Sequence, residues 1–133
     1  MSGASSVING IIEQKLLNLH TAYFAKVISV SGNTAKIQPL NMVKAVGKNA
    51  KKQAVMTVPI LQNVKKFKEG TRTITVSGER VSFSVLEAVS ISAGDTVLCL
   101  CGERDITETK KGNFAIPPVG HHRLSDSVIV GVM

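Results

Sequence analysis

Hydrophobic and polar residues alternate in short runs along most of the chain, and this spacing is typical of β-strands. The clearest run spans residues 71–86, where hydroxyl-bearing positions alternate with mostly apolar positions on both sides of a turn at residues 77–80. Successive side chains of a strand point to opposite faces of a sheet. The pattern therefore predicts a β-hairpin with one apolar face and one hydroxyl-rich face.

Other segments predict further strands. Residues 22–30 and 34–38 flank a Gly-Asn turn and predict a second hairpin, which Pro39 ends because proline donates no hydrogen bond to a sheet. Shorter strands are predicted at residues 55–58, 97–101 and 127–132. The run from Val97 to Cys101 is apolar on both faces, which is typical of a central strand that is covered on both sides.

The N-terminal region follows a different period. Apolar residues recur near helical spacing, and they are Val7, Ile8, Ile11, Ile12, Leu16 and Leu19. Ser5 or Ser6 can cap the first turn, so a helix is predicted over residues 6–19. Its apolar stripe needs cover, either from a barrel or from a neighbouring chain.

Together these elements predict the fold class. One helix and six or seven short strands, with turns at close intervals, indicate a mainly β protein: a small OB-like Greek-key barrel with an N-terminal α-helix and long basic loops. The helix is expected within residues 1–20 and the barrel within residues 21–133, as one domain. Hydrophobic residues make up 44% of the 133 but aromatic ones only 4%, so aliphatic side chains must fill the core.

The net charge of +7 comes from one region. Residues 41–72 hold eight basic residues and one acid, which gives 8 − 1 = +7, and the rest of the chain is neutral. Most of these residues are predicted to lie in two charged loops, at 41–53 and 65–70. The candidate partner-contact residues of this basic surface are Lys44, Lys48, Lys51, Lys52, Lys65, Lys66 and Lys68.

Such a surface is compatible with two classes of partner. Clustered cations bind phosphate backbones by releasing counterions, and OB barrels often bind single strands by stacking bases on aromatic side chains. Here Phe67 is the one aromatic residue placed among basic ones. We therefore favour a protein partner and keep a single-stranded nucleic-acid-binding OB protein as the alternative. A ribosome-binding β-barrel is a third, weaker interpretation.

No catalytic motif is found in the sequence. It lacks Gly-x-Ser-x-Gly, a P-loop, Gly-x-Gly-x-x-Gly and His-Glu-x-x-His, so no enzymatic activity is expected. Glu103 and Asp105 resemble a carboxylate pair, but Arg104 lies between them. We interpret this triplet as a salt-bridged strand end, with Arg104 paired to Asp126.

Metal binding and membrane insertion are not expected either. Cys99 and Cys101 would share one face of a strand and are interpreted as small buried hydrophobes rather than zinc ligands. His121 and His122 are adjacent, so in an extended segment they point to opposite sides and seldom hold one ion. We predict no cofactor, no signal peptide and no stable membrane insertion.

The last third of the chain carries an ordered series of short motifs. A Gly94-Asp95 turn precedes the apolar strand at residues 97–101, and the triplet Glu103-Arg104-Asp105 follows it. A loop then leads to Leu124-Ser125-Asp126 and the final strand. Near the start, Lys36-Ile37-Gln38-Pro39 ends an early strand. In order and spacing these segments resemble the N-terminal OB-fold domain of phage baseplate central spike proteins.

The resemblance implies a trimeric barrel at the tip of a tail tube, joined to a needle that pierces the cell. The implied partners are two further copies of the chain, tail tube and baseplate proteins, and a needle protein. The implied location is a virion or tail-like particle assembled in the cytoplasm of a host bacterium. Members of the family commonly continue into a β-helical needle, whereas this chain stops at Met133, so either the hub is short or the needle is a separate polypeptide.

The motif residues are assigned to turns and strand ends and not to chemistry. They are Gly94, Asp95, Glu103, Arg104, Asp105, Leu124, Ser125 and Asp126. The hairpin at residues 71–86 has no counterpart in the family, and it is therefore the main departure from a plain five-stranded barrel.

Overall fold

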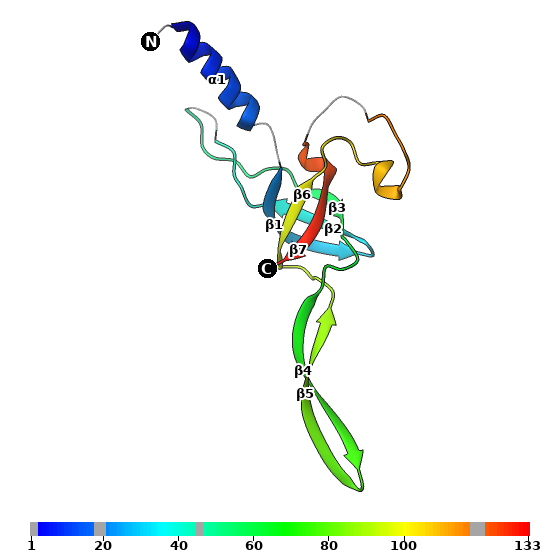
Figure 1. The fold of residues 1–133 in the computed structure, drawn as a ribbon. Helices are drawn as coiled ribbons and strands as arrows, with labels where there is room; N and C mark the ends of the chain where they lie inside the picture. The colour runs from blue at the N-terminus through cyan, green and yellow to red at the C-terminus, as the bar shows by residue number, and fades with distance from the viewer. Residues whose placement is uncertain (1–2, 18–20, 45–46, 118–121) are drawn as a thin grey trace.

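The computed structural model describes residues 3–17, 21–44, 47–117 and 122–133 (Figure 1). The elements in chain order are helix α1 (Gly3–Leu17), strands β1 (Ala22–Ser31), β2 (Thr34–Pro39), β3 (Met56–Pro59), β4 (Lys66–Val76), β5 (Glu79–Val89) and β6 (Thr96–Cys101), the 3₁₀ turns η1 (Thr109–Lys111) and η2 (Leu124–Asp126), and strand β7 (Ser127–Val132).

Five strands form a curled sheet in the order β3-β2-β1-β6-β7, and each neighbouring pair is antiparallel. The two edges of this sheet approach each other, because Ile60 and Ile129 form a parallel bridge and the Leu61 amide donates to the Ile129 carbonyl at 3.2 Å. The structure is therefore a five-stranded, partly open Greek-key barrel with one N-terminal helix. The predicted fold class, a mainly β protein with an OB-like barrel, is confirmed.

Alternation along the strands fills the barrel with aliphatic side chains. The inward positions are fully or almost fully buried, and the largest of them are Val27, Ile37, Val58, Val97 and Ile129. Cys99 and Cys101 lie on the same inner face of β6 as free thiols, as their spacing predicted. The core therefore depends on close packing of small branched residues, with Tyr23 as its one aromatic member.

A small polar cluster is buried within this core. The Tyr23 hydroxyl donates to Ser127 Oγ at 2.8 Å, and Ser127 Oγ in turn donates to the Leu124 carbonyl. The Cys101 sulfur lies 3.5 Å from the same Ser127 Oγ. These bonds satisfy polar atoms that would otherwise be costly to bury, and they fix the start of β7 against β1 and β6.

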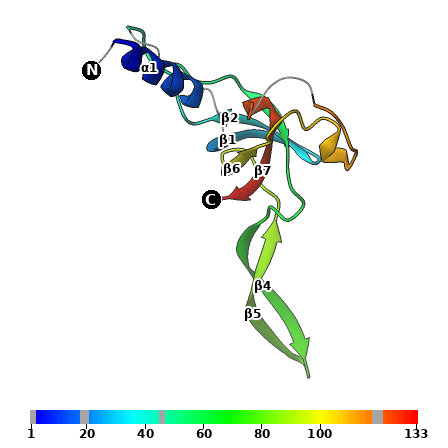
Figure 2. The ribbon, with the colours of Figure 1, turned by 45° about the horizontal axis from the view of Figure 1, so that its top comes forward.

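Strands β4 and β5, called the arm below, form a separate two-stranded sheet that projects from one end of the barrel (Figures 1 and 2). Their pairing runs without interruption from Lys66 opposite Val89 to Val76 opposite Glu79. Ser77 and Gly78 connect them with φ values of 51° and 81°, which suits a two-residue turn of type I′.

The arm confirms the predicted hairpin but is longer than predicted. The loop expected at residues 65–70 is wrong from Lys66 onward, because Lys66–Gly70 pair with Val85–Val89 and extend the ladder. The turn is also shorter than the predicted four residues, since Glu79 and Arg80 already belong to β5.

Helix α1 begins at Gly3, earlier than predicted, and it extends away from the barrel (Figures 1 and 2). The predicted end at Leu19 lies outside the described residues. Five apolar side chains of α1 are each 51–62% exposed: Val7, Ile8, Ile11, Ile12 and Leu16. The barrel of the same chain therefore leaves this stripe uncovered. No helix in the described ranges has both the length and the apolar character needed to cross a membrane.

Truncating one core residue tests the closure of the barrel. Ile129 is fully buried at the bridge between β7 and the end of β3, whereas Ile116 is 98% exposed. We expect Ile129→Ala to lower the free energy of unfolding by about 2–5 kcal/mol, because it removes buried methyl groups and leaves a cavity. The same substitution at Ile116 should change it by less than about 0.5 kcal/mol. Urea denaturation followed by circular dichroism measures both, and equal effects would contradict the described closure.

Candidate functional site

The Gly94-Asp95 turn lies against the middle of β1. Gly94 has a φ of 92°, a conformation that favours glycine. Its amide donates to the Val27 carbonyl, and the Val27 amide donates to the Asp95 carbonyl, both at 2.8 Å. The pairing of β1 with β2 shifts register next to Val27. This motif therefore sets where β6 enters the barrel.

The side chain of Asp95 connects the barrel to the arm. Its Oδ2 accepts the Ser92 amide at 2.8 Å and lies 2.9 Å from Lys66 Nζ. Lys66 Nζ also donates to Ser92 Oγ at 3.1 Å, and neighbouring Lys65 Nζ donates to Ser90 Oγ at 3.2 Å. The bond from Lys66, followed by that from the Ser92 backbone, lowers the pKa of Asp95. We call this group the arm root: Lys65, Lys66, Ser90, Ser92 and Asp95.

The two later motifs are brought together through their backbones. The Gly102 amide donates to the Asp126 carbonyl at 2.6 Å, and the His122 amide donates to the Glu103 carbonyl at 3.0 Å. A Cβ atom at Gly102 would collide with the side chain of Ile106, so this close approach requires glycine. Leu124 packs against the core. The two later motifs thus meet at the end of β6 that is opposite the Gly94-Asp95 turn.

The predicted ion pair between Arg104 and Asp126 is wrong. In residues 3–17, 21–44, 47–117 and 122–133, the ion pairs are Lys66–Asp95, Arg72–Glu87 and Lys111–Glu108. The backbone of Asp126 holds the strand end, and it does so through Gly102 rather than Arg104.

The polar groups around this strand end have separate environments. Asp105 accepts the Thr107 amide at 2.7 Å. The hydrogen bond from the Thr107 side chain, followed by that from the Thr107 backbone, lowers the pKa of Asp105. Ser125 is exposed. Arg104 Nε and His122 Nδ1 are buried and have no hydrogen-bond partner in the described part of the chain. His121 lies outside the described residues.

The basic residues separate into two groups. Lys44, Lys48, Lys51 and Lys52 are exposed on the loop between β2 and β3, and the backbones of Val43 and Lys51 pair across that loop at 2.8 and 2.7 Å. Figure 1 shows this loop on the side of the barrel from which α1 extends. Lys65, Lys66 and Lys68 lie at the start of the arm, toward the other end. The charge excess is therefore not one continuous surface.

The usual ligand face of an OB barrel consists of its second and third strands and two adjoining loops. Here β2 and β3 carry no aromatic residue, and the loop between β1 and β2 is the two-residue turn Gly32-Asn33. The loop between β6 and β7 has four basic and four acidic residues over 102–126 and is neutral. In the described part of this face the one exposed aromatic ring is Phe114 of the β6–β7 loop, so β2 and β3 themselves offer no stacking platform for a single strand.

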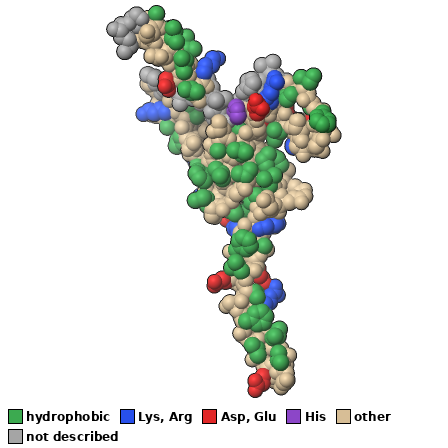
Figure 3. Space-filling model, viewed as in Figure 1, with side chains coloured by type: hydrophobic (Ala, Val, Ile, Leu, Met, Phe, Trp, Pro, Cys, Tyr) green, Lys and Arg blue, Asp and Glu red, His purple; other side chains and the backbone are tan. Residues whose placement is uncertain are grey.

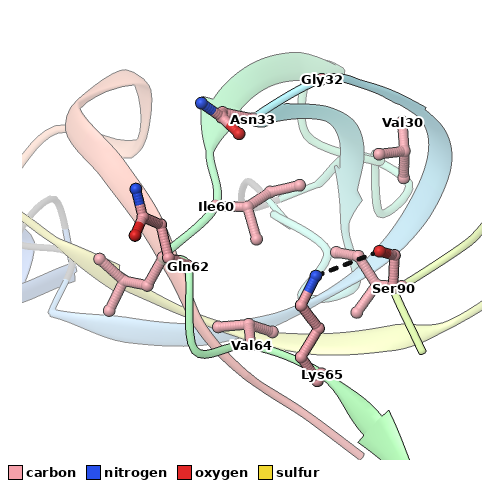
Figure 4. Close-up of a pocket in the computed structure, with 10 residues that line it drawn as sticks. Val30, Gly32, Asn33, Ile60, Gln62, Val64, Lys65 and Ser90 are labelled. Carbon is pink, nitrogen blue, oxygen red and sulfur yellow. Dashed lines mark hydrogen bonds between the residues drawn. The ribbon is translucent and has the colours of Figure 1, made fainter. Parts of the chain in front are cut away.

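A small pocket lies between the turn of the β1–β2 hairpin and the segment that leads into the arm (Figure 4). Val30, Ile60 and Val64 line it, and Lys65 reaches across it toward Ser90. Its lining has no histidine, cysteine or carboxylate. Nowhere in the described ranges do three or more His, Cys, Asp or Glu side chains come together as a metal site.

Apolar surface is the most prominent feature outside the core. The outer face of β1, β6 and β7 presents Phe24 and Leu100, which are 45% and 52% exposed, together with Leu98 and Val128. These four residues, called the barrel patch below, adjoin through strand pairing, since Phe24 is opposite Leu98 and Leu100 is opposite Val128. In Figure 3 hydrophobic side chains gather on this side of the barrel. The inner apolar side chains of β6 are therefore buried in the core, whereas its outer apolar side chains are not covered by any other part of the described chain.

The arm exposes a second apolar surface. Ile74 pairs with Val81, and these two share a face with Val76, Phe83 and Val85, called the arm face below. Four of the five are 41–52% exposed. The opposite face carries hydroxyls, and Thr73 Oγ1 lies 3.2 Å from Ser82 Oγ. Near the base of the arm this opposite face also carries Phe67 and Leu86, which are 69% and 67% exposed. The alternation predicted these two faces, but no pattern in the sequence indicated that the hairpin would stand apart from the barrel.

No family model matches the chain, and no curated protein matches it. The candidate functional site is therefore defined by geometry: the open apolar surfaces of α1, the barrel patch and the arm face, with a polar root that anchors the arm.

Removing one charge tests the arm root. Asp95→Asn keeps the size of the side chain but loses the charge that faces Lys66, so we expect the free energy of unfolding near neutral pH to fall by about 1–3 kcal/mol. Because the folded-state pKa of Asp95 is lowered, this stabilisation is complete above the unfolded value of about 3.9 and is lost as pH falls through the folded value. The two proteins should therefore converge in acid. Urea titrations across this range measure the difference, with Glu79→Gln at the arm tip as the control. A gap that persists in acid would contradict the role of Asp95.

The two thiols provide a second test. Burial raises the pKa of Cys99 to about 11 and also raises that of Cys101, so the thiolate fraction of Cys99 is about a hundredfold lower than that of a free cysteine. We expect neither thiol to react with a maleimide in the native protein and both to react in denaturant. Mass spectrometry counts the adducts. Rapid labelling of the native protein would contradict the described core.

Proposed function

We propose that this protein is a structural hub or spike component of a phage or phage-like contractile tail baseplate, a trimeric barrel that joins the tail tube to the cell-piercing needle. One observation carries the proposal: α1 and the arm extend from different ends of the barrel, and both expose apolar side chains. A chain with open apolar elements at two ends can hold neighbours on both sides, which is what a connector requires.

Each open element is too small to be stable alone in water. A helix of 15 residues is marginal without packing, and an isolated two-stranded hairpin is also marginal. Contiguous exposed apolar patches on a protein usually mark interaction sites. Three copies of the chain supply the missing partner surface, since interfaces of permanent oligomers resemble a protein core cut in half.

The order of sequence motifs supports the same proposal. The Gly94-Asp95 turn, the strand end at residues 103–105 and the lead into β7 at 124–126 resemble the baseplate spike barrel, and in the structure they build the β6–β7 part of a five-stranded barrel. This agreement concerns architecture. The partners at either end are inferred from the resemblance and from the open surfaces.

Binding of single-stranded nucleic acid is less well supported. The basic residues divide between the β2–β3 loop and the arm root, and β2 and β3 carry no aromatic side chain. The loop lysines remain available for an acidic neighbour in the assembly, where charge complementarity sets orientation more than affinity.

The mass of the protein in solution tests the proposal. Light scattering should give three times the chain mass of 14.1 kDa. Leu100→Glu places a charge in the barrel patch and should yield a folded monomer, because Leu100 points away from the core. Thr57→Glu, on the exposed side of β3, is the matched control and should remain a trimer.

Two outcomes would contradict this function. One is a wild-type chain that stays monomeric at high concentration. The other is tight, steeply salt-dependent binding of oligonucleotides that is lost when Lys44, Lys48, Lys51 and Lys52 become alanine, since that behaviour belongs to counterion release from a nucleic-acid site.

A further inference from the structure

We propose that the arm faces of three copies pack against one another around the trimer axis and form a six-stranded bundle that extends the hub beyond the barrel. The inference rests on the proposed trimer and adds to it the partner of the arm: a second and a third copy of the same hairpin. It assigns a role to the segment for which the family resemblance offers no counterpart.

The distribution of side chains on the outer part of the arm favours one covered face. Between residues 71 and 85, Ile74, Val76, Val81, Phe83 and Val85 share one side with Arg72 and Glu79, and Thr71, Thr73, Thr75, Ser82 and Ser84 share the other with Arg80. Nearer the base, Phe67 and Leu86 lie on the hydroxyl side and are 69% and 67% exposed. A sheet with one apolar and one polar face packs the apolar face inward and leaves the polar face in water. The barrel of the same chain cannot supply that cover, because four of the five apolar side chains are 41–52% exposed.

The charges of the arm favour identical copies as its partner. Around a symmetry axis each residue approaches its own copies, so an unbalanced charge on the arm would repel. The arm holds four basic residues and three acids, 4 − 3 = +1, and Lys66 is already paired with Asp95. Glu87 lies over Gly70, where a Cβ would stand only 3.3 Å from its carboxylate, and pairs there with Arg72. The charges of Arg72 and Glu87 are therefore neutralised within one arm, whereas Glu79, opposite Val76 at the tip of the same face, has no ion pair among the described residues.

The area of the arm explains why it must act together with the barrel. Each arm strand has 11 residues, so one face measures roughly 36 by 10 Å, or about 350 Å². Three such faces bury about 1,000 Å² in total, less than the 1,200–2,000 Å² or so of a stable interface. The arms would thus associate only when the barrel patches already hold the copies together. In Figure 3 hydrophobic side chains of the barrel and of the arm are visible from the same side of the molecule.

Two neighbouring residues of the arm allow a matched crosslinking experiment. Val81 belongs to the arm face, and Ser82 points to the opposite face next to it. In the full-length protein at low concentration, mild oxidation of Val81→Cys should produce disulfide-linked pairs, seen as a doubled mass on a non-reducing gel. Ser82→Cys should stay at the mass of one chain. The native Cys99 and Cys101 are buried at 0% and 5% exposure and do not interfere.

The outcomes separate this inference from the proposed function. Suppose that light scattering shows a trimer but Val81→Cys does not crosslink, or crosslinks no better than Ser82→Cys. That result would overturn the arm bundle and would not contradict the proposed hub. A monomeric wild-type chain would overturn both. Hydrogen exchange on the unmodified trimer supplies a test without any substitution: peptides covering 72–85 should be protected, and exchange at the rate of an unfolded chain would reject the bundle.

Discussion

A barrel of five short strands can bury only one face of each strand, and the arrangement of this molecule depends on that constraint. The inner faces of β1, β2, β3, β6 and β7 fill the interior with valine, isoleucine, alanine and cysteine. Every further apolar side chain must then lie outside. Because the chain also places apolar residues on α1, on the outer face of β6 and on the arm, much of its hydrophobic content is left at the surface of the single copy. The exposed apolar surfaces therefore follow from the geometry of a small barrel and do not depend on the conformation of one loop.

The connection between β3 and β6 shows how such a barrel accommodates a large insertion. The arm leaves and returns next to the Gly94-Asp95 turn, where Lys66, Ser92 and Asp95 bond to one another. Charge-assisted bonds are directional, so they fix the base of the hairpin. The residues of the arm face lie farther out, toward the turn at Ser77-Gly78. A polar root and an apolar outer portion let the arm keep its direction before any partner is bound, which lowers the conformational entropy lost on assembly.

Sequence alone could predict the features that depend on local spacing. Alternation located the arm, the β1–β2 hairpin and the shared face of Cys99 and Cys101, because period-two patterning is a local property of strands. Alternation could not identify the partner of Arg104, because several carboxylates lie within a few residues of it in the sequence. The Asp126 carbonyl comes to lie beside Gly102 only through the path of the folded chain. The sequence pattern also placed Lys66 and Lys68 in a loop, because lysine disfavours strands, whereas pairing with Glu87 and Val89 brings them into β4. The expected cover of the helix stripe does not come from within one chain.

The character of the open surface separates a connector from a nucleic-acid-binding barrel more clearly than the net charge does. A barrel that binds single strands concentrates cations and aromatic rings on one face. Here the exposed rings are dispersed: Phe24 lies on β1, Phe67 and Phe83 lie on the arm, and Phe114 lies in the β6–β7 loop, while most of the lysines lie elsewhere. Interface cores between proteins show the opposite composition, being depleted in charge and enriched in aromatic and aliphatic residues. The barrel patch and the arm face have that composition, and the lysines of the β2–β3 loop stand apart from them. The same +7 chain is thus better matched to a protein assembly with an acidic neighbour at one end than to a phosphate backbone along its length.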